Sequence, residues 1–253
     1  MKKIINNNIS PLQNNLLSAL PDEVKERLFP FIELVKLELG KVIFEAGDTL
    51  DNVYFPVDSI VSLLYVMESG ASAEISVVGD EGVVGIALFM GGGSTTCRAV
   101  VQSEGYAFRL KEKRLTDEFN RHGKLLGLML RYTQSLMTQI SQTAVCNRHH
   151  TIDQQLCRWL LLSLDRLPNK NINMTQELIA NMLGVRREGV TEAAGKLQKL
   201  GVIDYHRGHI TVLDRKKLEK LSCECYAVVK KESDRLGRVD LCGMKNEQGK
   251  DKV

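Results

Sequence analysis

The sequence predicts an α+β protein: an antiparallel β-roll of the jelly-roll type, then a long helix, then a C-terminal winged helix-turn-helix domain. Three stretches carry this prediction. Residues 36–110 are short β-rich runs separated by Gly, Asp and Asn turn signals. Residues 119–148 place apolar side chains at helical spacing without a proline. Residues 175–203 read as two short helices joined by a turn that contains glycine.

The last of these stretches fits the frame of a helix-turn-helix. Ala180 is small where the second helix must cross the first, Gly184 tolerates a positive φ in the turn, and Val190 is apolar where the second helix faces inward. Further apolar residues at helical spacing are expected inside, namely Leu178, Ile179, Met182, Leu183, Ala194 and Leu197. The side chains expected outside are Arg186, Arg187, Glu188, Thr191 and Glu192.

Length and composition bound the organisation. The 253 residues suffice for two domains, and we expect a β-roll sensor domain over 1–118, a dimerisation helix over 119–148 and a winged helix-turn-helix domain over 149–222. Residues 223–253 are expected to hold the end of a last helix and a disordered tail. The six cysteines are too scattered for a disulfide framework, and no run is long and apolar enough for a membrane span, so a cytoplasmic protein is expected.

Charge is unevenly distributed along the chain. The formal net charge is only +3, but residues 149–222 carry twelve Lys and Arg against eight Asp and Glu. Residues 1–148 carry fifteen against seventeen. The positive excess therefore lies in the segment that holds the helix-turn-helix, as phosphate binding requires.

The remaining elements follow from local signals. One or two short helices are expected from Pro21-Asp22, and an apolar helix over 151–166 should end before Pro168. Residues 168–173 read as a polar loop, after which Thr175 can cap the next helix through its hydroxyl. Residues 202–214 read as two strands around a tight turn at Arg207-Gly208, which is a wing. Residues 215–236 read as one final helix.

The apolar stripe of the long helix admits three uses: packing on its own β-roll, spacing the domains, or pairing with the same helix of a second subunit. We favour pairing, because the stripe runs past the width of one roll. A homodimer would also present two recognition helices to half-sites about 34 Å apart. The stripe consists of Leu125, Met129, Tyr132, Leu136, Ile140 and Thr143.

A β-roll, a long helix and a winged helix-turn-helix in this order resemble the Crp/Fnr family of bacterial transcription regulators over residues 15–225. VVGDEGVVGIALF (77–89) is similar to the glycine-led segment that opens the family's nucleotide pocket, and LGVRREGVTEAAGKLQKLGVI (183–203) is similar to its recognition unit. The resemblance implies a homodimer that binds double-stranded DNA, and RNA polymerase as well if it activates. The rival interpretation is a cyclic-nucleotide- or partner-binding module without specific DNA binding.

The sequence departs from the cyclic-AMP-binding members of that family. Their glutamate that accepts the ribose hydroxyl would follow Gly85, where Ile86 stands, and their Arg-Ser pair aligns with Cys97-Arg98. Isoleucine cannot accept that hydrogen bond. This pocket, which includes Leu88, is therefore expected either to bind something other than conventionally bound cyclic AMP or to be vestigial. An N-terminal iron–sulfur cluster of the family's type is excluded, because Cys97 is the first cysteine. No required cofactor is expected.

In the family, the positions of Arg187 and Glu188 read a guanine and a cytosine, and a guanidinium fork and a carboxylate suit those bases. Glu192 stands where a second arginine is usual, so the operator should differ from the family's best-known consensus. Candidates for phosphate contacts, each also compatible with plain surface, are Thr175, Gln176, Arg186, Lys196, Lys199, Arg207 and His209.

Catalytic and metal sites are not expected. None of the five histidines lies in the predicted roll, and no nucleophile elbow, P-loop or acid–base pair is present. His149-His150 reads as a polar hinge. On one continuous helix, Cys223 and Cys225 would point about 200° apart, which disfavours a shared role. The sequence therefore predicts a DNA-binding regulator that is not an enzyme.

Overall fold

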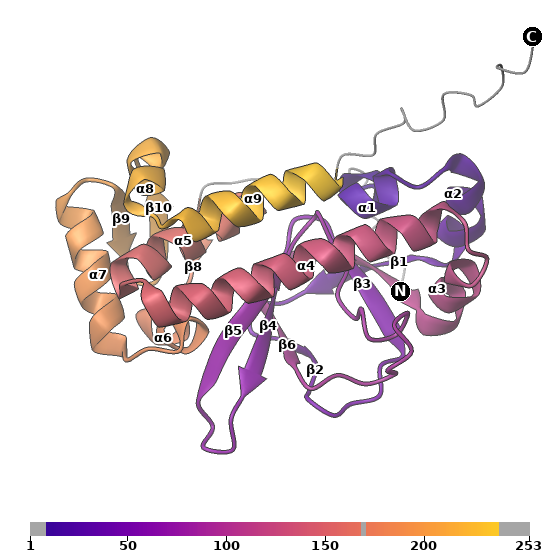
Figure 1. Ribbon diagram of the computed structural model, residues 1–253, viewed down its shortest axis with the longest axis horizontal. Helices are drawn as coiled ribbons and strands as arrows, with labels where there is room; N and C mark the ends of the chain where they lie inside the picture. Colours follow the sequence, from indigo (N-terminus) through magenta and orange to yellow (C-terminus); the bar gives the residue numbers. More distant parts are fainter. Residues whose placement is uncertain (1–8, 168–170, 238–253) are drawn as a thin grey trace, which may run out of the picture.

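The computed structural model describes residues 9–167 and 171–237, and it has the predicted order of a β-roll, a long helix and a helix-turn-helix domain (Figure 1). The first eight residues, which include three successive asparagines, and the part of the predicted tail beyond 237 lie outside these ranges. Four short helices precede the roll: η1 (Pro11–Gln13), α1 (Asn15–Ser18), α2 (Asp22–Leu28) and η2 (Phe29–Phe31). The helix predicted from Pro21-Asp22 is thus confirmed as α2. No described helix is long and apolar enough to cross a membrane.

The β-roll consists of two antiparallel sheets with strand orders β1-β7-β3 and β2-β6-β4-β5. Alternating apolar residues fill the space between them, as Val53 and Phe55 of β3 show, since both are fully buried. The predicted β-roll is therefore confirmed. Its strands are β1 (Glu33–Leu37), β2 (Val42–Phe44), β3 (Asn52–Pro56), β4 (Ile60–Val66), β5 (Ser72–Val78), β6 (Arg98–Ser103) and β7 (Gly105–Lys111).

The long helix is α4 (Lys124–His149), which follows the short α3 (Glu112–Phe119). Its 26 residues span about 39 Å. The stripe predicted to pair with a second subunit packs instead against the chain's own roll: Leu125 and Met129 are fully buried in the core that contains the strands. Tyr132, Leu136 and Ile140 belong to or pack against the same core, and Thr143 is 6% exposed. Assigning these six residues to a dimer interface was wrong, because a single chain already buries the stripe.

The helix-turn-helix domain confirms most of the predicted elements. It comprises α5 (Ile152–Leu164), α6 (Gln176–Leu183), α7 (Arg187–Lys199), β9 (Ile203–His206), β10 (His209–Val212) and α8 (Arg215–Leu221). Two expectations were wrong. Asn171–Asn173, predicted as loop, form strand β8, because Ile172 is buried and the segment pairs with β10. Leu178, predicted to face inward, is 39% exposed.

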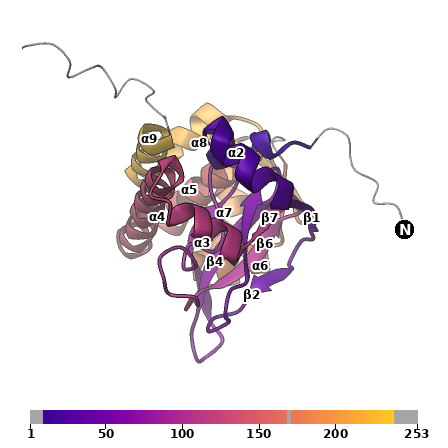
Figure 2. The same ribbon diagram turned by 90° about the vertical axis from the view of Figure 1, so that its right-hand side faces the viewer.

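The C-terminal segment predicted as one helix is two. The helix α8 ends at Leu221, Ser222 turns to an extended conformation with ψ 161°, and α9 (Glu224–Gly237) begins after Cys223. Figures 1 and 2 show α9 lying alongside α4. Leu236 at its far end is buried, and α9 ends one residue beyond the helix end predicted at residue 236.

The two domains pack on each other within one chain. Ile60, Leu64 and Val77 of the roll share a buried cluster with Trp159 and Leu160 of α5. The turn of the helix-turn-helix also touches the roll, since a Cβ on Gly184 would lie 3.1 Å from the Cβ of Ala73. A shift of the β4–β5 hairpin would therefore displace the turn of the helix-turn-helix directly.

Candidate nucleic-acid interface and sensor pocket

The helix-turn-helix has the geometry that its sequence predicts. Thr175 caps α6, its hydroxyl accepting a hydrogen bond from the Leu178 backbone N–H at 3.3 Å. Gly184 ends α6 in the left-handed region with φ 65°. Ala180 is 3% exposed and Val190 fully buried. The buried faces of the two helices thus fix the direction in which α7 presents its other side.

The five side chains predicted to face outward from α7 and its N-cap are all exposed. Arg187 and Glu188 form the first turn of α7, and neither side chain makes a hydrogen bond or ion pair with another described residue. They lie at the positive end of the helix dipole, where backbone N–H groups also point outward. A phosphate or base edge could therefore meet both side chains without displacing an intrachain partner.

Several of the other candidates already have partners in the chain. Lys196 Nζ lies 3.0 Å from Glu192 Oε1 and 3.2 Å from Asp153 Oδ2. Lys196 therefore offsets the negative charge that Glu192 would otherwise present to the phosphates. Thr191 Oγ1 donates to Gln176 Oε1 at 2.7 Å, which ties α7 to α6.

The wing is the β9–β10 hairpin, with His206 paired to His209. Arg207 and Gly208 have φ 48° and 85°, as a two-residue turn that follows the twist of the strands requires. The turn leaves Arg207 and His209 exposed, while His209 Nδ1 contacts Asn173 Oδ1 at 2.7 Å. Lys199 is exposed at the end of α7.

The residues predicted to line an effector pocket do not all come together. A cavity of about 90 Å³ inside the roll is lined by apolar side chains that include Ile86, together with Gly85 and Cys97. Leu88 and Arg98 are not part of its lining; Leu88 packs in the core of the roll, and Arg98 Nε lies 2.7 Å from Glu45 Oε2. Pockets for small molecules usually measure roughly 300–1,000 Å³. The cavity is therefore too small for a nucleotide.

Comparison with known proteins adds to this geometry. Residues 34–122 match the cyclic nucleotide-binding domain family, and residues 154–221 match the Crp-like helix-turn-helix domain family. The chain is a DNA-binding transcription regulator of the Crp/Fnr family. It is 23% identical over 192 residues to the global nitrogen regulator of Synechococcus elongatus, which covers 72% of this chain and 86% of that protein.

Solved structures of Crp/Fnr proteins share the fold. FixK2 from Bradyrhizobium japonicum superposes with a TM-score of 0.64 at 16% identity, over 76% of this chain and 98% of that one. A CRP-family transcriptional regulator from Thermus thermophilus gives a TM-score of 0.62 at 16% identity, over 74% and 96% respectively. The order of β-roll, long helix and helix-turn-helix is therefore the family's.

In this Crp/Fnr regulator, the glycine-led loop after β5 also contacts α4 and the segment after α5. A Cβ on Gly79 would lie 2.8 Å from the Arg166 side chain, and a Cβ on Gly82 would lie 2.4 Å from the Tyr132 ring. The glycines are thus needed for close approach of α4 and of the segment after α5. We call residues 79–82 of this loop the sensor loop. Its two glycines allow it to pack against α4 and against the start of the segment that follows α5.

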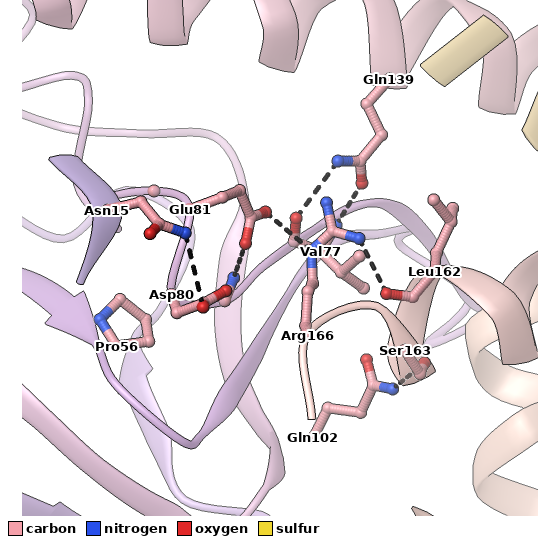
Figure 3. Close-up of polar contacts among 12 residues, drawn as sticks. Asn15, Pro56, Val77, Asp80, Glu81, Gln102, Gln139, Leu162, Ser163 and Arg166 are labelled. Atoms are coloured by element: carbon pink, nitrogen blue, oxygen red, sulfur yellow. Dashed lines mark hydrogen bonds and ion pairs between the residues drawn. The ribbon is translucent and has the colours of Figure 1, made fainter. Parts of the chain in front are cut away.

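Figure 3 shows the polar contacts at this junction, which sequence reasoning missed. Arg166 Nε lies 2.7 Å from Glu81 Oε1, and Arg166 Nη1 donates to the Leu162 carbonyl at 2.8 Å. From α4, the Gln139 amide binds both the backbone N–H and the carbonyl of Val77, at 2.7 and 3.2 Å. Burial, followed by the charge of Glu81, raises the pKa of Asp80 to about 6. Pairs of this kind, 62 to 85 residues apart in the chain, leave no local pattern in a sequence.

A second buried polar group connects the roll to α5. Ser62 Oγ lies 2.6 Å from Glu74 Oε2 and 2.8 Å from Gln102 Oε1, while Gln102 Nε2 donates to Ser163 Oγ at 2.9 Å. Burial raises the pKa of Glu74 to about 7. A hydroxyl has one proton to donate, so a protonated Glu74 supplies the second hydrogen bond that Ser62 needs.

Proposed function

We propose that this protein is a homodimeric regulator in the bacterial cytoplasm that reads its operator with α7 of each subunit. The observation that carries the proposal is the pair Arg187 and Glu188 in the first turn of α7, whose exposed side chains make no hydrogen bond or ion pair with another described residue. A guanidinium fork matches guanine O6 and N7, and a carboxylate accepts from the cytosine amine. The exposed wing at Arg207 would contact the flanking phosphates.

The dimer would use a face of α4 other than the predicted stripe. Exposed residues recur at alternating spacings of three and four along this outer face, which is the pattern of a two-helix seam. Leu130 is 54% and Met137 is 61% exposed, although both are large and apolar. We define the outer face of α4 as Gly127, Leu130, Gln134, Met137, Ser141 and Ala144.

The signal would reach the helix-turn-helix through the junction of Figure 3. A movement of the loop that holds Glu81 would act directly on Arg166. An effector that binds more tightly when the Glu81–Arg166 contact is formed, or when it is broken, would shift the protein toward that conformation. The small apolar cavity disfavours cyclic AMP as that effector. A contact with RNA polymerase belongs to the proposal only if the protein activates transcription.

In vitro selection of bound DNA from a random library tests the proposal. We expect a two-fold symmetric motif with half-sites about one helical turn apart, and affinity that falls as salt rises. Recovery of no motif, with affinity independent of salt, would favour the second candidate. That candidate is a ligand- or partner-binding module without specific DNA binding, and the match of residues 34–122 to the cyclic nucleotide-binding domain family supports it.

A further inference from the structure

Four side chains with metal-binding atoms meet where α4 ends and where α8 is followed by α9. They are Cys146, His150, Cys223 and Cys225, and their ligand atoms all lie within 4.8 Å of one another. Cys146 Sγ is 3.6 Å from Cys223 Sγ, and Cys225 Sγ is 3.6 Å from His150 Nδ1. Within residues 9–167 and 171–237, no other group of three or more such side chains is arranged in this way.

The break between the two C-terminal helices brings the cluster together. Cys146 lies in the last turn of α4, and His150 follows one turn later on the same side. Cys223 stands between α8 and α9 rather than within a helix, so the expected 200° divergence from Cys225 does not apply. Cys146, Cys223 and Cys225 are buried residues, with exposures of 0%, 5% and 1%.

We propose that these four side chains bind one Zn²⁺ ion. Zinc bonds of about 2.3 Å to sulfur and about 2.0–2.1 Å to nitrogen give tetrahedral edges of about 3.8 Å between sulfurs and about 3.6 Å between sulfur and nitrogen. The two close contacts of 3.6 Å match both kinds of edge, and modest side-chain rotations shorten the others.

The donor set selects the metal. Three thiolates and an imidazole are soft ligands that suit zinc and not magnesium or calcium. Four protein ligands leave no open position, which is the form of a structural site. In a [4Fe–4S] cluster each ligand binds a different iron, and in a [2Fe–2S] cluster the ligands divide between two irons. Ligand atoms that all lie within 4.8 Å of one another instead suit a single ion.

The surroundings of the cluster fit a bound metal. His150 Nε2 lies 3.3 Å from Glu224 Oε2, so the carboxylate holds the proton on that nitrogen and leaves Nδ1 for the ion. Arg158 is 4% exposed, and its Nε has no hydrogen-bond partner among the described residues. Its charge acts on Cys146 and Cys225, and also on Glu74. Zinc with three thiolates carries a net charge of −1, which this guanidinium offsets.

The site would join both boundaries of the helix-turn-helix domain. Cys146 and His150 precede α5 directly, and Cys223 follows α8 by two residues. A metal there fixes the end of α4 to the start of α9 and so sets the angle between the long helix and the domain. This inference does not depend on the proposed operator recognition, because its test measures the metal.

The test begins with the full-length protein purified under reducing conditions. Elemental analysis should find about one zinc per chain, and loss of zinc should lower the Tm. After the zinc is replaced by Co²⁺, intense thiolate-to-cobalt absorption and the d–d bands of a tetrahedral ion should appear. Cys223→Ser, Cys225→Ser and His150→Ala should each weaken zinc retention at least tenfold. Cys97→Ser and the neighbouring His149→Ala are matched controls that should retain it.

The cobalt spectrum of the unmodified chain keeps the proposal testable even if a variant fails to fold. A wild-type protein that holds no zinc and gives no thiolate–cobalt band would overturn the proposal. Full zinc retention in the Cys223→Ser/Cys225→Ser double variant would do the same. If the purified protein contains iron and an equal amount of sulfide instead of zinc, the site holds an iron–sulfur cluster and the zinc proposal is wrong. If Cys146 and Cys223 form a disulfide and the reduced protein binds no metal, the two cysteines are a redox pair and the zinc proposal is wrong.

Discussion

Arg166 and Glu81 form an ion pair across the boundary between the two domains, with 2.7 Å between Nε and Oε1. The Arg166 side chain is only 7% exposed, whereas that of Glu81 is 23% exposed. Removing one partner of a buried pair leaves the other charge without compensation, and this loss exceeds what the intact pair contributes. Breaking the contact between the sensor loop and the helix-turn-helix domain at this pair should therefore lower the stability of the folded protein.

The first prediction concerns this pair. Glu81→Gln should lower the free energy of unfolding by roughly 2–4 kcal/mol, because a neutral amide no longer compensates the buried guanidinium. Urea denaturation measures the loss. The matched control is Glu45→Gln, which breaks the more exposed pair with Arg98 and should cost no more than about 1 kcal/mol. Equal losses in the two variants would show that water already screens Arg166.

The second prediction is a pH dependence of stability that comes from Glu74. Burial raises its pKa from 4.5 in the unfolded chain to about 7 in the folded one. The folded state thus binds the proton more tightly, so the contribution is complete below pH 4.5 and is lost as the pH rises to about 7. At 1.36 kcal/mol per pKa unit, the loss is about 3 kcal/mol.

Glu74→Gln isolates this contribution. The free energy of unfolding of the wild type, minus that of the variant, should fall by about 3 kcal/mol between pH 4 and pH 8. The matched control is Glu68→Gln, which removes a carboxyl at the exposed tip of the β4–β5 hairpin instead of a buried one. Asp80 also has a raised pKa, so the stability of the Glu74→Gln variant should still depend on pH in part. A flat difference for Glu74→Gln would mean that water reaches this carboxyl in the folded state.

The parts of the molecule that the sequence predicted are those set by local patterns. The frame of Ala180, Gly184 and Val190 placed the two helices and their exposed faces, because spacing alone decides which side of a helix is buried. Turn residues likewise placed the wing at Arg207-Gly208. The β-roll followed from alternation between turn signals.

What could not be predicted depends on contacts between distant segments. A stripe such as Leu125 to Thr143 reports that a helix has a buried face, but a sequence does not say whether its own roll or another subunit covers it. The Arg166–Glu81 pair spans 85 residues. The cysteine cluster was missed because one residue, Ser222, leaves the helical conformation and so changes where Cys223 points.

The third prediction tests the turn of the helix-turn-helix. Gly184→Ala should destabilise the protein by roughly 1–3 kcal/mol, because φ 65° strains an alanine and its Cβ would crowd Ala73 at 3.1 Å. Gly195→Ala, within α7 and with open space around its Cβ, should instead stabilise by up to about 1 kcal/mol. Thermal unfolding of both variants gives the comparison. Destabilisation by both would point to a general intolerance of α7 and not to the turn.

The fourth prediction concerns base reading. Arg187→Ala should lose discrimination at one base pair in each half-site, at a cost of about 1–3 kcal/mol for the preferred base. Competition binding with operator variants, taken from the selected motif, measures this loss. Lys113→Ala, an exposed basic residue on α3 of the sensor domain, should change neither affinity nor preference. If Arg187→Ala weakens binding to every sequence equally, the side chain contacts phosphate instead of a base.

The last prediction places the dimer on the outer face of α4. Met137→Glu should shift the protein to monomer and abolish two-fold symmetric operator binding, because two carboxylates would face each other where two methionines packed. Sedimentation equilibrium at several concentrations gives the oligomeric state. Met90→Glu is the matched control, since Met90 is 60% exposed against 61% for Met137 but lies on the roll. A Met137→Glu protein that stays dimeric would move the seam elsewhere, and α9 would be the next candidate because its Val228 is apolar and 40% exposed.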